Sequence, residues 1–247
     1  MPRRTAVVHA ACVVTVVALA LAACGPAGPT VPPQPVYHSA PTPARSFASD
    51  AKYAVAMIEK FASDPLVLHV VQTTNVTASD DVDSMKVSDS TTVDVSNGDM
   101  KIHTVTKVAG KTTKLDAVVV GTSVYAREGS KPWRKQPRSA WQQSILDTIR
   151  SFNPIRDPAQ LEYVGVETID KRKLHHLTAV QKFPFVMADG QRGTYEKFDV
   201  WVEEDGTPVL AKGKILMIGA YSIEVKGTQE LRFSKFGGKI KITAPKL

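Results

Sequence analysis

Period-two alternation of apolar and polar residues is the feature that most constrains the fold. The alternation is clearest over residues 221–233. One face of that segment would carry Tyr221, Ile223, Val225, Gly227, Gln229, Leu231 and Phe233, and the other Ser222, Glu224, Lys226, Thr228, Glu230 and Arg232. Because successive side chains of a strand point to opposite faces, this pattern predicts a strand with one face inward and one in water.

Similar alternation recurs along most of the chain. The segments concerned are 66–77, 83–95, 99–108, 113–120, 123–127, 162–169, 172–181, 194–203, 208–217 and 239–243. Several are separated by glycine-containing turns, at Asn97-Gly98, Ala109-Gly110, Gly121-Thr122, Asp189-Gly190 and Asp205-Gly206. Consecutive strands joined by short turns predict an antiparallel meander.

Two segments break this pattern with helical periodicity. Residues 51–62 place their apolar side chains on one side of a helix, and Ser63-Asp64-Pro65 ends the pattern. Residues 139–152 begin with a capping box and carry Trp141, Ile145, Ile149 and Phe152 on one stripe. A further helical turn is expected after Asp157, with Pro158 at its first position.

These elements predict an α+β fold. A twisted antiparallel sheet of this size must curl, and its apolar face needs a cover. We therefore expect a curved sheet of about ten or eleven strands, an unclosed half-barrel, wrapped around two or three helices.

The first residues have the features of an export signal. Arg3 and Arg4 precede an uncharged run from Ala6 to Ala23, which ends in Leu-Ala-Ala-Cys24. That tetrapeptide looks like the lipobox of bacterial lipoproteins, which implies that Cys24 is lipidated and becomes the new N-terminus. The alternative is an ordinary secretory signal that happens to contain this cysteine. With the lipobox, the protein is held by lipid on the outer face of the cell membrane, in the cell envelope.

Three regions follow from this processing. Residues 1–23 are the signal peptide, and residues 24–48 are a tether containing seven prolines, which cannot form a core. Residues 49–247 are long enough for one domain. Cys12 is lost with the signal and Cys24 is lipidated, so the mature chain has no disulfide and its stability must come from a packed core.

The mature chain is mildly basic, because its formal charge falls from +7 to +5 when Arg3 and Arg4 leave. A basic face could contact anionic head groups, and solvated sheet faces explain the same charge. We expect no nucleic-acid partner.

No motif of a hydrolase, metalloprotease or nucleotide-binding fold is present. His175 and His176 are adjacent on a predicted strand, so they face opposite ways and cannot share one metal. His69 and His103 are expected at the surface of neighbouring strands. The acidic residues at 80–83 and 203–205 coincide with predicted turns, where solvated charge is favoured over a calcium site. We therefore expect no catalytic residue, no metal and no cofactor.

Two aromatic features need separate interpretation. Trp133 is expected to pack over the rim of the sheet. The segment from Phe183 to Met187 is apolar although it lies between two predicted strands. An apolar loop there could pack as a lid, contact another envelope protein, or touch the membrane.

Taken together, the lipobox, the proline-rich tether, the helix leading into the strand at 66–71 and the run of strands resemble the LppX/LprG type of cell-envelope lipoproteins, within the wider LolA/LolB-like superfamily. The segment from Val118 to Arg127, followed by Trp133-Arg134-Lys135, is similar to that group's hairpin and tryptophan pattern. The resemblance covers most of 49–243. It implies an unclosed barrel with an apolar cavity that takes acyl chains.

On this resemblance, the expected cavity residues are Trp141, Ile145, Ile149, Phe198, Val200, Ile223, Val225 and Leu231. The same residues could simply fill a core, because cores and lipid cavities are lined by the same side chains. We thus carry two hypotheses. The first is a membrane-anchored protein that binds and carries the acyl chains of a lipid or glycolipid. The second is a protein-interaction or sensory module of the same fold without lipid cargo.

Overall fold

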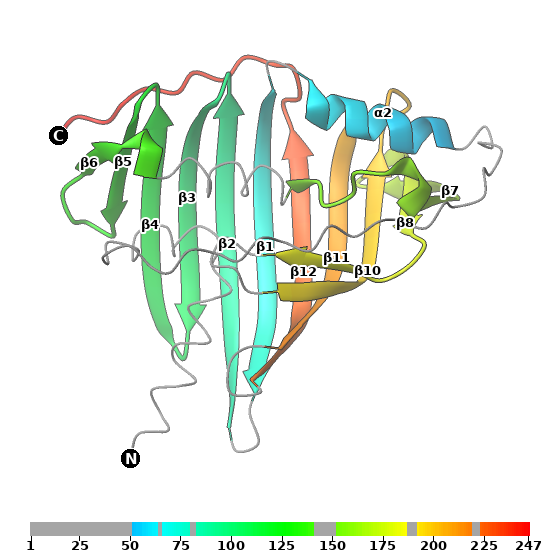
Figure 1. The fold of residues 1–247 in the computed structure, drawn as a ribbon, viewed down its shortest axis with the longest axis horizontal. Coiled ribbons are helices and arrows are strands. Elements are labelled where there is room, and N and C mark those ends of the chain that lie inside the picture. The colour runs from blue at the N-terminus through cyan, green and yellow to red at the C-terminus, as the bar shows by residue number, and fades with distance from the viewer. Residues whose placement is uncertain (1–50, 64–65, 80–82, 141–151, 187–191, 219–222) are drawn as a thin grey trace.

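The computed structural model describes residues 51–63, 66–79, 83–140, 152–186, 192–218 and 223–247. A curved antiparallel sheet makes up most of this part of the chain (Figure 1). Its strands are β1 Val67–Ser79, β2 Ser84–Ser96, β3 Asp99–Val108, β4 Lys111–Val120, β5 Ser123–Glu128, β6 Arg134–Pro137, β7 Leu161–Ile169, β8 Arg172–Ala179, β9 Phe183–Val186, β10 Arg192–Val202, β11 Pro208–Ile218 and β12 Glu224–Ser234. The fold is thus mostly β.

The strand order is β6-β5-β4-β3-β2-β1-β12-β11-β10-β8-β7, and β9 pairs with β10 off this path. The path therefore holds eleven strands, as expected, and within the described residues its two ends do not pair with each other. The order differs from a simple meander. The last strand, β12, returns to pair with β1, from His69↔Ser234 to Ser79↔Glu224, and joins two runs of strands at the centre of the sheet.

Tight turns fix the register of the hairpins where the sequence predicts them. Asn97-Gly98 and Ala109-Gly110 both have positive φ at each residue, which suits a two-residue turn between twisted strands. The β7–β8 turn at Asp170-Lys171 has the same conformation without a glycine. Aspartate tolerates the left-handed region, but this dipeptide gave no turn signal in the sequence.

One α-helix is present among the described residues, where the sequence predicts two or three. This is α2, Ala51–Ala62, which matches the expected first helix. The turn predicted after Asp157 is a 3₁₀ helix, Pro158–Gln160, capped by the Asp157 carboxylate, and it stays short because β7 begins at Leu161. A second 3₁₀ turn covers Arg138–Ala140. Most of the predicted helix over 139–152 lies outside the described residues, although Phe152 itself is helical and buried.

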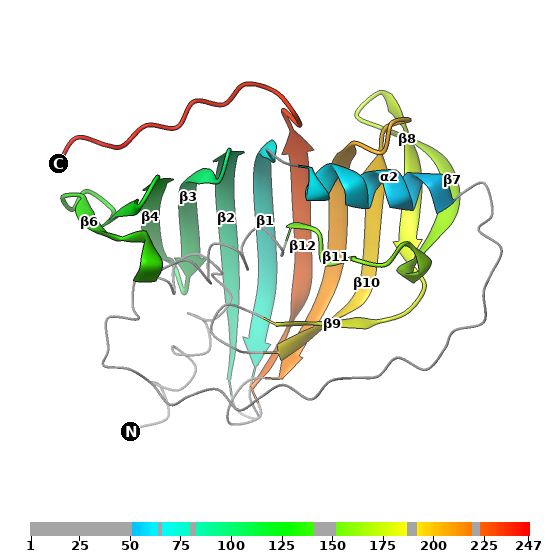
Figure 2. The ribbon, with the colours of Figure 1, turned by 45° about the horizontal axis from the view of Figure 1, so that its top comes forward.

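Two strand assignments from the sequence are wrong. Residues 239–243 form no strand, although Ile240 and Ile242 alternate with exposed neighbours. This segment leaves the sheet after the Gly237-Gly238 turn and runs past the ends of the strands from β1 towards β4 without a strand partner (Figures 1 and 2). Conversely, Phe183–Val186 is the strand β9 rather than a loop, because its backbone pairs with β10. Met187 lies outside the described residues.

The core lies on the concave face of the sheet, with α2 across the ends of β12, β11 and β10 (Figures 1 and 2). Phe61 of α2 packs edge-on against Phe233 of β12. At the other end of the helix, Tyr53 stacks on His175 of β8. Between these contacts, Gly206 lies so close to Ala56 that a Cβ there would stand 2.4 Å from the Ala56 Cβ. The helix is therefore fixed over one half of the sheet.

Candidate functional site

The inner face of the sheet carries apolar side chains from strand to strand. The register aligns Val70 of β1 with Val93 of β2, Ile102 of β3 and Ala117 of β4. Beyond β1, an adjacent row runs through Leu231, Ala211, Val200 and Leu177 of β12, β11, β10 and β8. All eight side chains are buried. The strands thus create a continuous apolar surface from β5 to β8, because every second residue points to it.

Five of the expected cavity residues lie in this buried surface. Phe198, Val200, Ile223, Val225 and Leu231 belong to the main apolar cluster and are at most 3% exposed. Their burial is confirmed, and the cavity itself stays a prediction. Trp141, Ile145, Ile149 and Cys24 lie outside the described residues.

The helix α2 is too short to cover this surface. Nine strands from β5 to β8 span roughly 38 Å at the usual spacing between strands, whereas the 12 residues of α2 extend over about 18 Å. The inward residues of β2 to β5, such as Val95, Met100 and Val119, are nevertheless buried. No described helix lies over them in Figures 1 and 2.

A stripe of buried polar groups crosses the apolar surface, and sequence reasoning missed it. We call it the inner polar belt, and it consists of the buried Gln72, Thr74, Asp89, Thr91 and Thr104 and the half-buried Thr106 on β1, β2 and β3. The Asp89 carboxylate accepts hydrogen bonds from Thr91 Oγ1 at 2.9 Å and Thr106 Oγ1 at 2.7 Å. Asp89 is 1% exposed, and this burial raises its pKa even though both hydroxyls favour the charged form.

The belt continues into the second half of the sheet. Gln229 of β12 is paired with Thr74 and accepts a hydrogen bond from the Tyr195 hydroxyl at 2.6 Å. Full burial raises the pKa of this phenol. No motif marks the inward threonines of β2 and β3 in the sequence, and only their two-residue spacing from apolar neighbours such as Val93 could have indicated that they face inward.

The acidic turn between β10 and β11 contacts α2 and β8. Lys60 donates to Asp205 at 2.7 Å, and His175 Nε2 lies 2.6 Å from Glu204. The Lys60 ammonium and the Thr207 backbone amide lower the pKa of Asp205 to about 2. No group of three potential metal ligands occurs in the described part of the chain.

His175 and His176 face opposite sides of the sheet, as their adjacency predicts. His176 lies on the outer face, stacked on Trp201, with Nδ1 2.8 Å from Glu167 and Nε2 3.2 Å from Asp199. Both ring nitrogens are therefore occupied by carboxylates, so this residue has no nitrogen with which to activate a nucleophile.

Among the described residues, His69, His103, Trp133, Phe183 and Phe185 also have structural partners. His69 and His103 each contact an aspartate of the next strand, Asp94 and Asp116. Arg127 stacks on Trp133 at the rim of the sheet. Phe183 and Phe185 of β9 pack against Tyr195, with ring centroids 5.0 and 4.8 Å apart. The two phenylalanines of the expected contact loop are thus packed within the protein, and a partner at this segment stays a prediction.

No described helix has the length and apolar character needed to cross a membrane. The sequence matches no known family profile and no curated protein.

Solved structures with some similarity include three bacterial proteins. The first is a DUF1329 family protein from Desulfovibrio piger, 14% identical over 75% of this chain and 90% of the other, with a TM-score of 0.25. A putative outer membrane lipoprotein-sorting protein domain from Vibrio parahaemolyticus is 11% identical over 73% and 89%, with a TM-score of 0.24. A LolA superfamily protein from Nitrosomonas europaea is 11% identical over 76% and 92%, with a TM-score of 0.23. These scores are too low to support an inference about function.

Proposed function

We propose that this protein is a lipoprotein of the cell envelope that binds the acyl chains of a lipid or glycolipid against the inner face of its sheet, and carries or presents them. Lipid on Cys24 would hold it on the outer face of the membrane. The proposal joins the lipobox of the sequence to the apolar surface of the fold.

The observation that carries the proposal is the mismatch between the apolar surface and its helix. Within the described residues, about 38 Å of buried apolar sheet faces the helix α2 of about 18 Å. Acyl chains are apolar, flexible and narrow, so they would suit a slot opened over this surface, where the small aliphatic side chains Val93, Ile102 and Ala117 are buried in this structure.

The inner polar belt gives this slot a place for the polar part of a lipid. Ligand sites are mostly apolar and contain a few polar groups that fix the orientation of the ligand. Asp89, Thr91 and Thr104 would accept or donate hydrogen bonds to an ester or hydroxyl group, while the acyl chains extend along the apolar rows.

Native mass spectrometry of the purified full-length protein tests the proposal. A carrier shows a reproducible added mass that disappears on extraction with organic solvent, whereas a lipid bonded to Cys24 stays with the polypeptide. A chain with no extractable mass contradicts lipid carriage and favours the interaction module.

A substitution distinguishes a lipid slot from a closed core. Ala117→Trp fills the inner face at β4, where the alanine is buried, and Val164→Trp is the control at a position of β7 that is 54% exposed. In a slot, Ala117→Trp displaces the lipid and leaves the Tm close to that of the control. In a closed core it lowers stability by about 1–3 kcal/mol and the protein carries no extractable mass before or after the change.

A further inference from the structure

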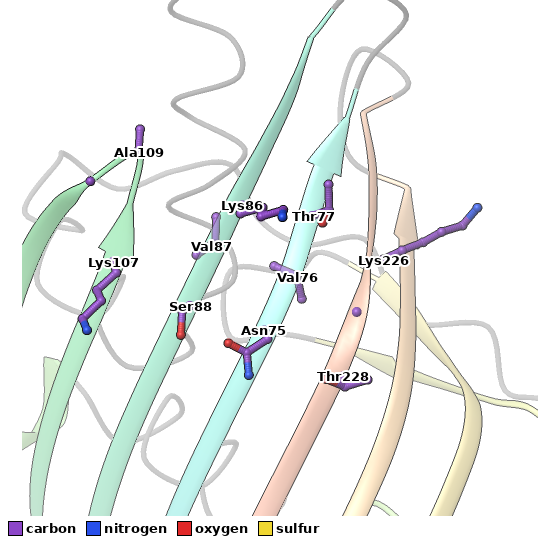
Figure 3. A pocket seen from close by; sticks show the side chains of 12 residues that line it. Asn75, Val76, Thr77, Lys86, Val87, Ser88, Lys107, Ala109, Lys226 and Thr228 are labelled. Carbon is purple, nitrogen blue, oxygen red and sulfur yellow. The ribbon is translucent and has the colours of Figure 1, made fainter.

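The outer face of the sheet, opposite α2, has two adjoining hollows. The first, of about 450 Å³, lies over β3, β2, β1 and β12 and is shown in Figure 3. The second, of about 470 Å³, lies over β1, β12, β11 and β10. Both are lined by Asn75 and Thr228, so they form one continuous depression, which we call the outer groove. It crosses six strands, or roughly 24 Å.

The outer groove has an excess of positive charge. Lys86, Lys107 and Lys226 line the first hollow without any carboxylate. The second hollow is lined by Lys197, Lys212, Lys214, Asp199 and Glu230. Six lysines against two carboxylates leave a formal excess of four positive charges.

Three of these lysines have no acidic partner among the described residues. Lys226 pairs with Glu224, Lys197 with Asp199 and Lys212 with Glu230. Lys86, Lys107 and Lys214 make no such pair, and all three are exposed. Unpaired cations that line one depression repel each other, and a bound anion removes that repulsion.

Neutral hydrogen-bonding groups lie between the cations. Figure 3 shows Ser88 and Asn75 on neighbouring strands between Lys107 and Thr228, and Thr77 beside Lys86. Hydroxyl and amide groups donate to the oxygens of an anion. The lining of both hollows contains no arginine. Lysine binds phosphate as a point charge without a required planar geometry, so lysines with hydroxyl and amide donors between them suit the tetrahedral oxygens of phosphate.

We propose that the outer groove binds a linear polyanion whose charges are phosphate groups. A chain of repeated charges follows a depression that crosses six strands and meets Lys107, Lys86 and Lys214 in turn. A flat membrane surface would instead contact the cations that protrude most. This proposal does not depend on lipid binding, because the groove lies on the opposite face of the sheet.

Binding of dye-labelled sodium polyphosphate to the full-length protein at low salt, followed by fluorescence anisotropy, tests this site. Lys86→Gln/Lys107→Gln/Lys214→Gln should weaken binding roughly tenfold or more. The control Lys101→Gln/Lys173→Gln/Lys239→Gln removes the same charge from exposed lysines outside the groove and should change binding less than about threefold. Unchanged Tm values confirm that both variants are folded.

Three results would overturn the proposal. Equal weakening by both triple variants would mean that only net charge matters. Equally tight binding of polyglutamate would mean that the groove does not select phosphate. Binding to vesicles containing phosphatidylglycerol, without binding to polyphosphate, would make the face a membrane contact instead.

Discussion

The two halves of the inner face are built from different side chains. On the side of β8 and β10–β12, aromatic rings pack in separate groups: Phe198 with Tyr195, Phe233 with Phe61 of α2, and His175 with Tyr53 of α2. On the side of β2–β5, the inward residues include no aromatic ring and are mainly valine, alanine and threonine, with Met100, Ile102 and Leu115.

The two kinds of side chain suit the two halves of the sheet to different roles. Aromatic rings contact one another in defined geometries and fix a helix in place. Small aliphatic chains leave a smooth surface that adapts to what lies on it. We therefore expect the aromatic half to carry the stability of the fold and the aliphatic half to bind cargo.

Truncation of a core residue in each half is the strongest test of this comparison. Phe198→Ala removes a ring that packs against Tyr195 and Phe183 and should cost about 3–5 kcal/mol of unfolding free energy. Ile102→Ala in the aliphatic half, also a truncation to alanine, should cost less, about 2–3 kcal/mol. Urea denaturation measures both values. Similar losses at the two positions would remove the distinction between the halves.

Adding a methyl group at two turn glycines gives the next largest effect. Gly206→Ala places a Cβ 2.4 Å from that of Ala56 at φ +80° and should cost about 2–4 kcal/mol through the clash with α2 and the backbone strain. Gly121→Ala, in the β4–β5 turn, meets no atom within 4 Å at φ +54°, so only strain of about 1–2 kcal/mol is expected. Thermal unfolding compares the stability of the two variants. Equal losses of stability would show that α2 moves away from residue 206 and relieves the clash.

The buried carboxyl of the aliphatic half should make stability depend on pH. Burial raises the pKa of Asp89 above its ordinary 3.8, so the native state binds a proton more tightly than the unfolded chain. Stability should therefore fall as pH rises from below about 4 through the raised pKa, because the native state must then bury a charge.

Asp89→Asn should remove this decrease and match or exceed the wild type in Tm at neutral pH. The control is Asp116→Asn on the outer face of β4, where hydrogen bonds with His103 and Arg127 overcome partial burial and lower the carboxyl pKa. That variant should lose stability at neutral pH. A wild-type Tm that rises steadily from pH 4 to 7, with no change in Asp89→Asn, would contradict the role given to burial.

The acidic turn that contacts α2 should change stability with pH in the opposite direction to Asp89, and by a small amount. The pKa of Asp205 is lowered to about 2, so its contribution is complete above the unfolded value of 3.8 and is lost as pH falls toward 2. Because its side chain is 61% exposed, the pair with Lys60 is worth at most about 1 kcal/mol. Asp205→Asn should lower the Tm slightly at pH 7, and this difference should shrink as the pH falls through about 2. A loss of Tm that is the same at pH 7 and at pH 2 would mean that the substitution acts through packing and not through the charge of Asp205.

The sequence predicted the strands well because alternation is a local property. The predicted strand over 221–233 corresponds to β12, and the described inward positions from Val225 to Phe233 lie on the predicted face. The turns at Asn97-Gly98 and Ala109-Gly110 were equally predictable from composition. The burial of Phe198 and Leu231 followed from the same alternation.

Features that depend on distant partners were not predictable in this way. Nothing in the local pattern of β12 selects β1 as its neighbour. The segment from Phe183 to Val186 was predicted to be a loop because it lies between two predicted strands, yet its backbone pairs with β10 as an extra strand. The inner polar belt was hidden because threonine is common on both faces of a sheet.

The pairing of β1 with β12 has a consequence for how the chain reaches this structure. The two central strands are separated by about 150 residues, so their contacts form only after a long loop has closed, which slows folding. Until Glu224–Ser234 is available, β1 and β11 are both open edges, and each could pair with another chain. The strand β12 therefore joins the two runs of strands. Without it there would be two partial sheets, and with it there is one continuous sheet.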